Sequence, residues 1–300
     1  DLNQRPPRHF IMSLLYILIL VGLGFVIVGP AIGLFASLPF YPGTWEELQK
    51  NLMDPLNHPD MKIPLYFMQA FATLVGLVLT PMLILKKYKT PMNVFFRNDK
   101  IEWIPVLITS FVVVIFMAVI SVVVEWNANL DFPDFASGFE HWARSREDAA
   151  TEATEFLTTF SSSFEFIVAI VVIAILPAVG EEVVFRGLIQ NELYRGTRNI
   201  HASIWISAIL FSAIHMQFFG FVPRLLLGAL FGYLYFWSKN LWVPVAAHFM
   251  NNGFTVFMLY LQQQKLVKTN VENAEALPWY MGLISLAISL LLLFYLKKRY

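Results

Sequence analysis

The chain has 300 residues, of which 57% are hydrophobic and 14% are charged, and its formal net charge is +0. Soluble globular domains carry about 25% charged residues, so this composition predicts an all-α, polytopic bundle of membrane-spanning helices. The balanced charge gives no indication of a nucleic-acid partner, and the lack of cysteine excludes disulfides and thiolate metal sites.

Eight apolar stretches approach the roughly 20 residues that a helix needs to cross a bilayer. In chain order they are residues 10–35, 64–85, 103–125, 164–190, 201–218, 222–238, 242–261 and 279–296. The first has no small-residue cleavage pattern, which favours a retained span over a signal peptide. No internal repeat is evident, so residues 1–300 are expected to form a single integral membrane domain.

Basic residues predict the orientation, because cytoplasmic loops carry an excess of Lys and Arg. With the N-terminus in the cytoplasm, most of the 21 Lys and Arg residues fall on the cytoplasmic side of the expected spans. We therefore expect a multi-pass protein with both termini in the cytoplasm. The aromatic-rich composition favours a bacterial inner membrane.

The segment 126–163 is the longest connection on the outer side and is rich in Asp and Glu. Within it, residues 139–160 could form a helix that lies on the membrane surface. The simplest interpretation is a solvated acidic connection. The alternative is a lid, or an element that docks a protein partner.

Ionisable residues inside spans are costly in a bilayer and by default indicate a functional site. They occur in three stretches, as Glu181, Glu182 and Arg186 in the fourth, His215 in the fifth, and His248 with Asn252 in the seventh. Glu182 and Arg186 are four residues apart and can neutralise each other on one helix face. Glu181 is left to face the two histidines, where its carboxylate can act as a general base.

Other unusual residues have simpler interpretations. Pro177 and Gly180 are expected to kink the fourth span near the carboxylates. Gly228 and Gly232 form a small-residue face that is typical of close helix packing. Arg224, at the outer end of the sixth span, is expected to snorkel towards the membrane surface.

Three motifs in a fixed order carry a family resemblance. The segments EEVVFR, FSAIH and HFMNN fit the patterns EExxxR, FxxxH and HxxxN on three separate stretches. Over residues 164–261 the chain resembles the CPBP family, which comprises CAAX prenyl endopeptidases and bacteriocin-processing intramembrane proteases and is also called the Abi family. The resemblance implies an α-helical intramembrane endopeptidase that cleaves near the terminus of a membrane-associated protein or peptide.

The resemblance also implies a role for each motif residue. Glu181 and His215 would activate a water molecule, and His248 and Asn252 would hold the oxyanion. The supporting positions fall on Glu182 and Arg186. Asn251 is a second candidate for the position given to Asn252.

Two other functions stay open beside the peptidase. The chain could be a catalytically idle membrane scaffold or partner subunit that keeps the protease fold. It could also be a transporter that uses a buried Glu as a proton relay, although that function predicts a repeat symmetry that the sequence does not show.

Zinc is the cofactor that the sequence leaves open. Glu181, His215 and His248 are of the types that form a catalytic zinc site. Against zinc, they come singly from three stretches, and the sequence indicates no acidic partner for either histidine. A metal-free Glu/His mechanism is therefore the preferred interpretation.

Overall fold

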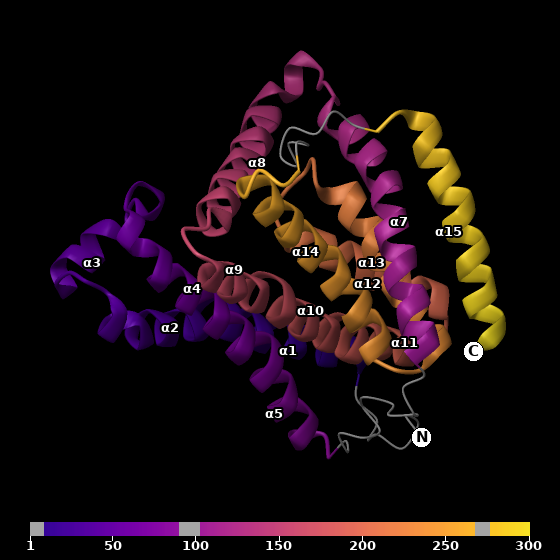
Figure 1. The fold of residues 1–300 in the computed structure, drawn as a ribbon. Helices are drawn as coiled ribbons and strands as arrows, with labels where there is room; N and C mark the ends of the chain where they lie inside the picture. The colour runs from indigo at the N-terminus through magenta and orange to yellow at the C-terminus, as the bar shows by residue number, and fades with distance from the viewer. Residues whose placement is uncertain (1–8, 90–102, 268–276) are drawn as a thin grey trace.

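The computed structural model describes residues 9–89, 103–267 and 277–300. Its regular elements are helices, and no strand occurs among the residues that it describes. The predicted all-α, polytopic bundle is therefore confirmed (Figure 1).

The helices follow one another in three groups along the chain. The first group is α1 (Phe10–Leu23), η2 (Gly24–Val28), α2 (Gly29–Ser37), η3 (Leu38–Phe40), α3 (Trp45–Asn51), η4 (Pro55–Asn57), η5 (Pro59–Met61), α4 (Lys62–Phe71), η6 (Ala72–Leu79) and α5 (Thr80–Lys87). The second group is α7 (Trp103–Ala128), η7 (Asp134–Ala136), α8 (Ser137–Thr158), α9 (Ser163–Ala169), η8 (Ile170–Ile175), α10 (Leu176–Glu182), η9 (Val183–Gln190) and α11 (Asn191–Thr197). The third group is α12 (Ile200–Ala213), α13 (Phe221–Ser238), α14 (Trp242–Gln263) and α15 (Trp279–Arg299).

Six helical segments within the described residues are long and apolar enough to cross a membrane. They are Phe10–Phe40, Pro59–Lys87, Trp103–Ala128, Ser163–Thr197, Phe221–Ser238 and Trp279–Arg299, and they correspond to six of the predicted spans.

The other two predicted spans differ in length or polarity. α12 has only 14 residues and ends at Ala213 instead of near residue 218. α14 has 22 residues, but polar side chains such as His248 and Asn252 lower its mean hydropathy. The exact number of eight spans therefore stays a prediction.

Prolines explain where three of the long helices change from α-helical to the wider π-helical geometry. Three π-helical stretches, η2, η6 and η8, each end two residues before a proline, at Pro30, Pro81 and Pro177. Proline has no N–H and its ring clashes with the carbonyl one turn earlier, so the hydrogen bonds shift to i→i+5 spacing there. Gly180 also allows close helix packing, since a Cβ there would lie 2.7 Å from Leu77 Cβ, and its part in a kink stays a prediction.

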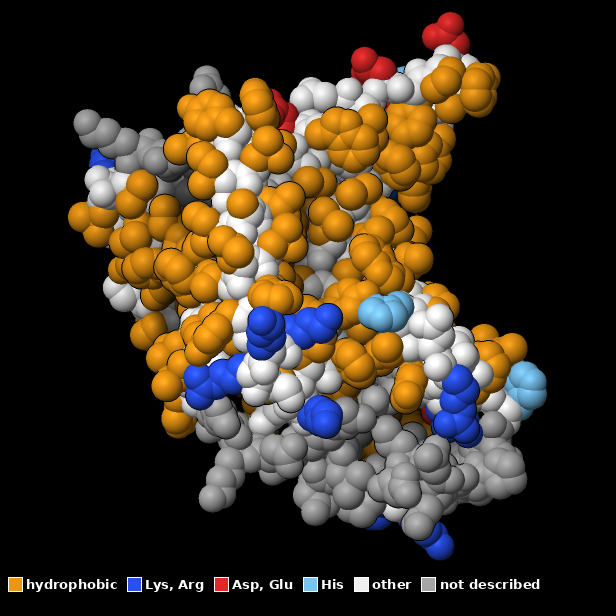
Figure 2. All heavy atoms as spheres, turned by 90° about the vertical axis from the view of Figure 1, so that its right-hand side faces the viewer, with side chains coloured by type: hydrophobic (Ala, Val, Ile, Leu, Met, Phe, Trp, Pro, Cys, Tyr) orange, Lys and Arg blue, Asp and Glu red, His pale blue; other side chains and the backbone are white. Residues whose placement is uncertain are grey.

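The surface of the bundle is divided by side-chain type. On the face drawn in Figure 2, a belt of hydrophobic side chains separates an end with Lys and Arg from an end with Asp and Glu. Such a belt suits the hydrocarbon core of a bilayer. α5 and α15 both finish in basic residues, and both finish in the lower part of Figure 1. This agrees with the predicted orientation, and which end faces the cytoplasm stays a prediction.

The acidic segment contains the helix that was expected within residues 139–160, and it spans Ser137–Thr158 as α8. At its C-terminal end, Gln263 Nε2 of α14 donates to Thr158 O at 2.7 Å. Nearer its middle, Gln217 Nε2, from the connection between α12 and α13, donates to Glu147 Oε1 at 3.1 Å. α8 therefore bridges the α12–α13 connection and α14, whereas its position on a membrane surface stays a prediction.

Candidate active site

The residues of the three motifs come together around one pocket. A cavity of about 130 Å³ is lined by Glu181, Phe211, His215, Arg224, Leu227, Phe231, His248, Asn251 and Asn252. The lining includes all four residues that were expected to be catalytic, together with Asn251. The two expected supporting residues, Glu182 and Arg186, are buried outside this lining.

A helical hairpin explains how Glu181 and His215 meet. α11 is followed by Arg198, whose φ of 55° lies in the left-handed region that ends a helix and redirects the chain into α12. Glu181 and His215 are equally far along the chain from Arg198, so antiparallel packing brings them to the same level. α13 packs on α12 through Gly228 and Gly232, as predicted, and completes this wall.

Glu182 and Arg186 form the predicted ion pair, and the pair is fully enclosed. Arg186 Nη1 donates to Glu182 Oε1 at 2.9 Å, and the two residues are 1% and 0% exposed. Arg186 Nη2 donates to Gly228 O at 2.7 Å, and the guanidinium lies 5.0 Å from the ring centre of Phe211. Charges this deeply buried need both a counter-charge and hydrogen bonds, so this cluster fixes η9 against α13.

Glu182 also holds His248, a contact that the sequence did not indicate. His248 Nδ1 lies 2.8 Å from Glu182 Oε1, and because an ionised carboxylate only accepts, Nδ1 carries the proton. Phe231 stacks on the imidazole at 5.2 Å between ring centres. Nε2 is consequently directed to the pocket, 3.8 Å from Glu181 Oε2. Among the described residues, the structure therefore gives His248, though not His215, an acidic partner that the sequence did not indicate.

His215 and the two asparagines add a lone pair and a donor. His215 Nδ1 lies 2.8 Å from Phe211 O, which only accepts, so the lone pair of the neutral ring is on Nε2. Asn251 Nδ2 donates to Asn252 Oδ1 at 3.1 Å, which orients the Asn252 amide. The pocket thus combines a carboxylate, a histidine lone pair and an amide N–H group.

Arg224 is a pocket residue that the sequence analysis assigned wrongly. It was expected to snorkel towards the surface, whereas it lines the pocket together with Glu181. Its Nη2 donates to Gln217 Oε1 at 2.5 Å. Side chains of a helix tilt towards its N-terminus, so from the first turn of α13 Arg224 reaches back to the α12–α13 connection. Its position inside a span was the available signal.

The pocket contains side chains that could bind a metal ion, but they are not arranged around a common point. No group of three or more His, Cys, Asp and Glu side chains within residues 9–89, 103–267 and 277–300 is arranged to hold a metal. Glu182 behind His248 is the kind of acidic partner that zinc-binding histidines have. Zinc binding by Glu181, His215 and His248 would nonetheless require these side chains to move.

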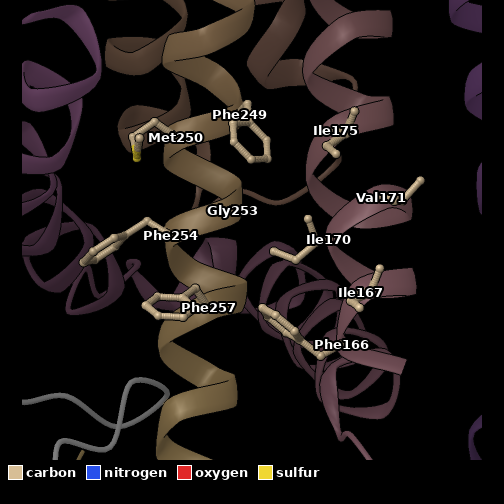
Figure 3. A pocket seen from close by; sticks show the side chains of 10 residues that line it. All are labelled: Phe166, Ile167, Ile170, Val171, Ile175, Phe249, Met250, Gly253, Phe254 and Phe257. Atoms are coloured by element: carbon tan, nitrogen blue, oxygen red, sulfur yellow. The ribbon is translucent and has the colours of Figure 1, made fainter. Parts of the chain in front are cut away.

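An apolar groove lies beside the pocket, between α9–η8 and α14 (Figure 3). Its volume is about 470 Å³, and it is lined by Phe166, Ile167, Ile170, Val171, Ile175, Phe249, Met250, Gly253, Phe254 and Phe257. Figure 3 shows Phe249 of α14 facing Ile170 and Ile175 across the groove. Because Phe249 directly follows His248, the groove and the pocket occupy neighbouring faces of one turn of α14.

Comparisons with known proteins agree with the motifs. Residues 163–254 match the family described as Type II CAAX prenyl endopeptidase Rce1-like. The family that the motifs predicted is therefore confirmed for this segment, and no solved structure matches the chain.

Three curated bacterial proteins are each similar to about a third of the chain or slightly less. "Putative membrane peptidase YdiL" of Bacillus subtilis (strain 168) is 35% identical over 101 residues, which are 32% of this chain and 41% of YdiL. "Membrane-embedded CAAX protease MroQ" of Staphylococcus aureus (strain USA300) is 33% identical over 102 residues, or 32% of this chain and 41% of MroQ. "Uncharacterized protein YpbD" of B. subtilis is 31% identical over 85 residues, or 27% of this chain and 40% of YpbD. The chain thus spans about two fifths of the length of these relatives.

Proposed function

We propose that this chain is an intramembrane endopeptidase that hydrolyses a peptide bond near the terminus of a membrane-associated protein or peptide. The main support is the convergence of Glu181, His215, His248 and Asn252 on one pocket in a bundle of apolar helices. The match of residues 163–254 to a peptidase family supports the same reaction.

In the proposed reaction, Glu181 and His215 activate water. The water lies between the Glu181 carboxylate and the Nε2 lone pair of His215, and Glu181 takes one of its protons as the general base. The water oxygen then attacks the carbonyl carbon of the scissile peptide. As the tetrahedral intermediate collapses, Glu181 returns the proton to the leaving amine, so the proton count balances.

His248 and Asn252 stabilise the oxyanion in this mechanism. Because the Nδ1 proton of His248 is engaged by Glu182, Nε2 can donate only from the imidazolium form. Glu182 Oε1 lies 2.8 Å from Nδ1 and Glu181 Oε2 lies 3.8 Å from Nε2, so each ring nitrogen has a carboxylate near it. Asn252 Nδ2 is the second donor. Removing one such donor costs about 10²–10³-fold in kcat.

The apolar groove supports a membrane-associated substrate. Its lining of aromatic and branched aliphatic side chains suits an apolar segment or group that approaches the pocket from the bilayer. A location in a bacterial inner membrane, with both termini in the cytoplasm, completes the proposal.

The experiment that tests this function compares the membrane peptides of cells with the parent protein and with Glu181→Gln. The variant keeps the side-chain shape and removes its basicity, so peptides produced by the parent should fall by about 10²–10⁴-fold. Glu140→Gln, on α8 and outside the pocket lining, is the control and should leave the peptides unchanged. Unchanged peptides in Glu181→Gln cells would exclude Glu181 as the base, and identical peptides with and without the protein would favour the idle scaffold.

A further inference from the structure

Arg224 brings a fixed positive charge into the wall of the candidate active site. Its Nη2 donates to Gln217, while its Nη1, which solvent does not reach, has no hydrogen-bond partner among the described residues. A buried charged donor without an acceptor is costly. The guanidinium therefore has an unpaired Nη1 amino group, with two N–H bonds, at the wall of a pocket that Arg224 lines.

Gly220 indicates that the place of this guanidinium is built into the fold. A Cβ on Gly220 would lie 2.5 Å from both Nη1 and Nη2 of Arg224. Any other side chain would push the guanidinium away from the backbone, so the glycine keeps open the space that it occupies. The position of the charge thus depends on two residues of one turn.

Glu147 of α8 is connected to Arg224 through hydrogen bonds of Gln217. Gln217 donates to Glu147 and accepts from Arg224, so it links the two charges. Burial raises the pKa of Glu147, and the charge of Arg224 offsets part of this effect. Glu181 is also within electrostatic range of Arg224. Neither carboxylate accepts a hydrogen bond from Nη1 in the part of the chain that the structure describes.

We propose that Arg224 forms an anion subsite of the catalytic pocket, which binds a carboxylate of the peptide substrate close to the scissile bond. This inference rests on the proposed peptidase function and adds the chemistry of its substrate. A guanidinium is suited to a carboxylate because its N–H groups match the two oxygens in one plane. The carboxylate belongs either to the C-terminus of the substrate or to an Asp or Glu side chain.

Glu147 tunes this subsite through its own charge. In its ionised form it attracts the guanidinium through Gln217 and repels a second carboxylate. Removing the charge of Glu147 should therefore strengthen carboxylate binding without changing the affinity for a neutral peptide. α8, the helix of the acidic segment, thereby becomes part of substrate selection.

A binding measurement tests the subsite independently of cleavage. The full chain carries Glu181→Gln throughout, so that no probe is hydrolysed, and binding is followed by fluorescence anisotropy in detergent. The probe is an apolar hexapeptide with an N-terminal fluorescein, in three forms. One form has a free C-terminal carboxylate, one has a C-terminal amide, and one has the amide with an internal Glu.

At least one carboxylate form should bind about tenfold more tightly than the neutral amide, as expected for a hydrogen bond between charged groups. The form that binds more tightly identifies the source of the carboxylate. Arg224→Gln should abolish the preference, Arg224→Lys should retain part of it, and Gly220→Ala should weaken it by displacing the guanidinium. Arg144→Gln, on α8 and outside the pocket lining, is the matched control and should change nothing.

The results that would overturn the subsite are equally defined. They are the absence of binding by any form, equal affinity of all three forms, or a preference that survives Arg224→Gln. If Arg224→Gln fails to fold, Glu147→Gln decides, because it should tighten the carboxylate forms alone. Carboxylate-selective binding without cleavage in the parent protein would retain the subsite and reject the peptidase, so the two failures are distinguishable.

Discussion

The buried ion pair between Glu182 and Arg186 offers the sharpest test of how the site is held together. In Glu182→Gln, the guanidinium of Arg186 loses its counter-charge at a position that is only 1% exposed. Removing one partner of a buried pair costs about 3–5 kcal/mol. Arg186→Met should cost at least as much, because it also removes the donor to Gly228 O.

The double variant should be less destabilised than the sum of the two single variants. With both charges gone, no uncompensated charge stays in the core, and the amide of Gln at position 182 can still accept from His248 Nδ1. Coupling between contacting residues is typically 0.5–3 kcal/mol, and about 3 kcal/mol is expected here because the desolvation is complete.

The assay is the free energy of unfolding in mixed micelles, measured by titration with a denaturing detergent and followed by circular dichroism. Glu140 and Arg144 have the same spacing and also form an ion pair, but they lie on α8 with the Arg side chain 43% exposed. Glu140→Gln and Arg144→Met should therefore leave stability nearly unchanged. Single variants at Glu182 or Arg186 that are as stable as the parent, or strictly additive effects in the double variant, would refute the reasoning.

Three further predictions concern the oxyanion, the metal and the topology. Asn252→Ala should lower kcat by about 10²–10³-fold. Asn251→Ala should lower kcat less, because it only removes the donor to Asn252 Oδ1. A larger loss of kcat in Asn251→Ala than in Asn252→Ala would make Asn251 the oxyanion donor. Activity of the purified protein should survive exhaustive chelation; a stoichiometric transition metal, with activity lost on chelation and restored by zinc, would contradict the metal-free mechanism. In this cysteine-free chain, an impermeant thiol reagent applied from outside should label a cysteine placed at Asp148 on α8 and spare one placed at Lys86 in α5; the opposite pattern would invert the topology.

The sequence by itself determined that this protein lies in a lipid bilayer and which kinds of side chain form its candidate site. Long apolar stretches require helices in a bilayer, because every backbone polar group must be satisfied within the segment. Charged residues inside such stretches are costly, which made Glu181, Glu182 and Arg186 candidates for a functional site. The i, i+4 spacing of Glu182 and Arg186 was sufficient to predict their ion pair, because a helix places such residues on one face.

Only the tertiary structure decided which side chains of different helices contact each other in the site. His248 is 66 residues from Glu182 in the chain, and no local rule connects them. The contact arises because α14 packs against α10, which also fixes the proton on Nδ1 and thereby limits Nε2 to donating from the imidazolium form.

The position of Arg224 could likewise not be predicted from the sequence. Near the end of a helix, a snorkelling Arg and a pocket Arg have the same sequence signature, because both need a long side chain close to a polar boundary. The bend after Ala213, the open space at Gly220 and the contact of Gln217 with α8 direct this guanidinium inward. These are contacts between segments that are brought together by packing, and helix periodicity carries no information about them.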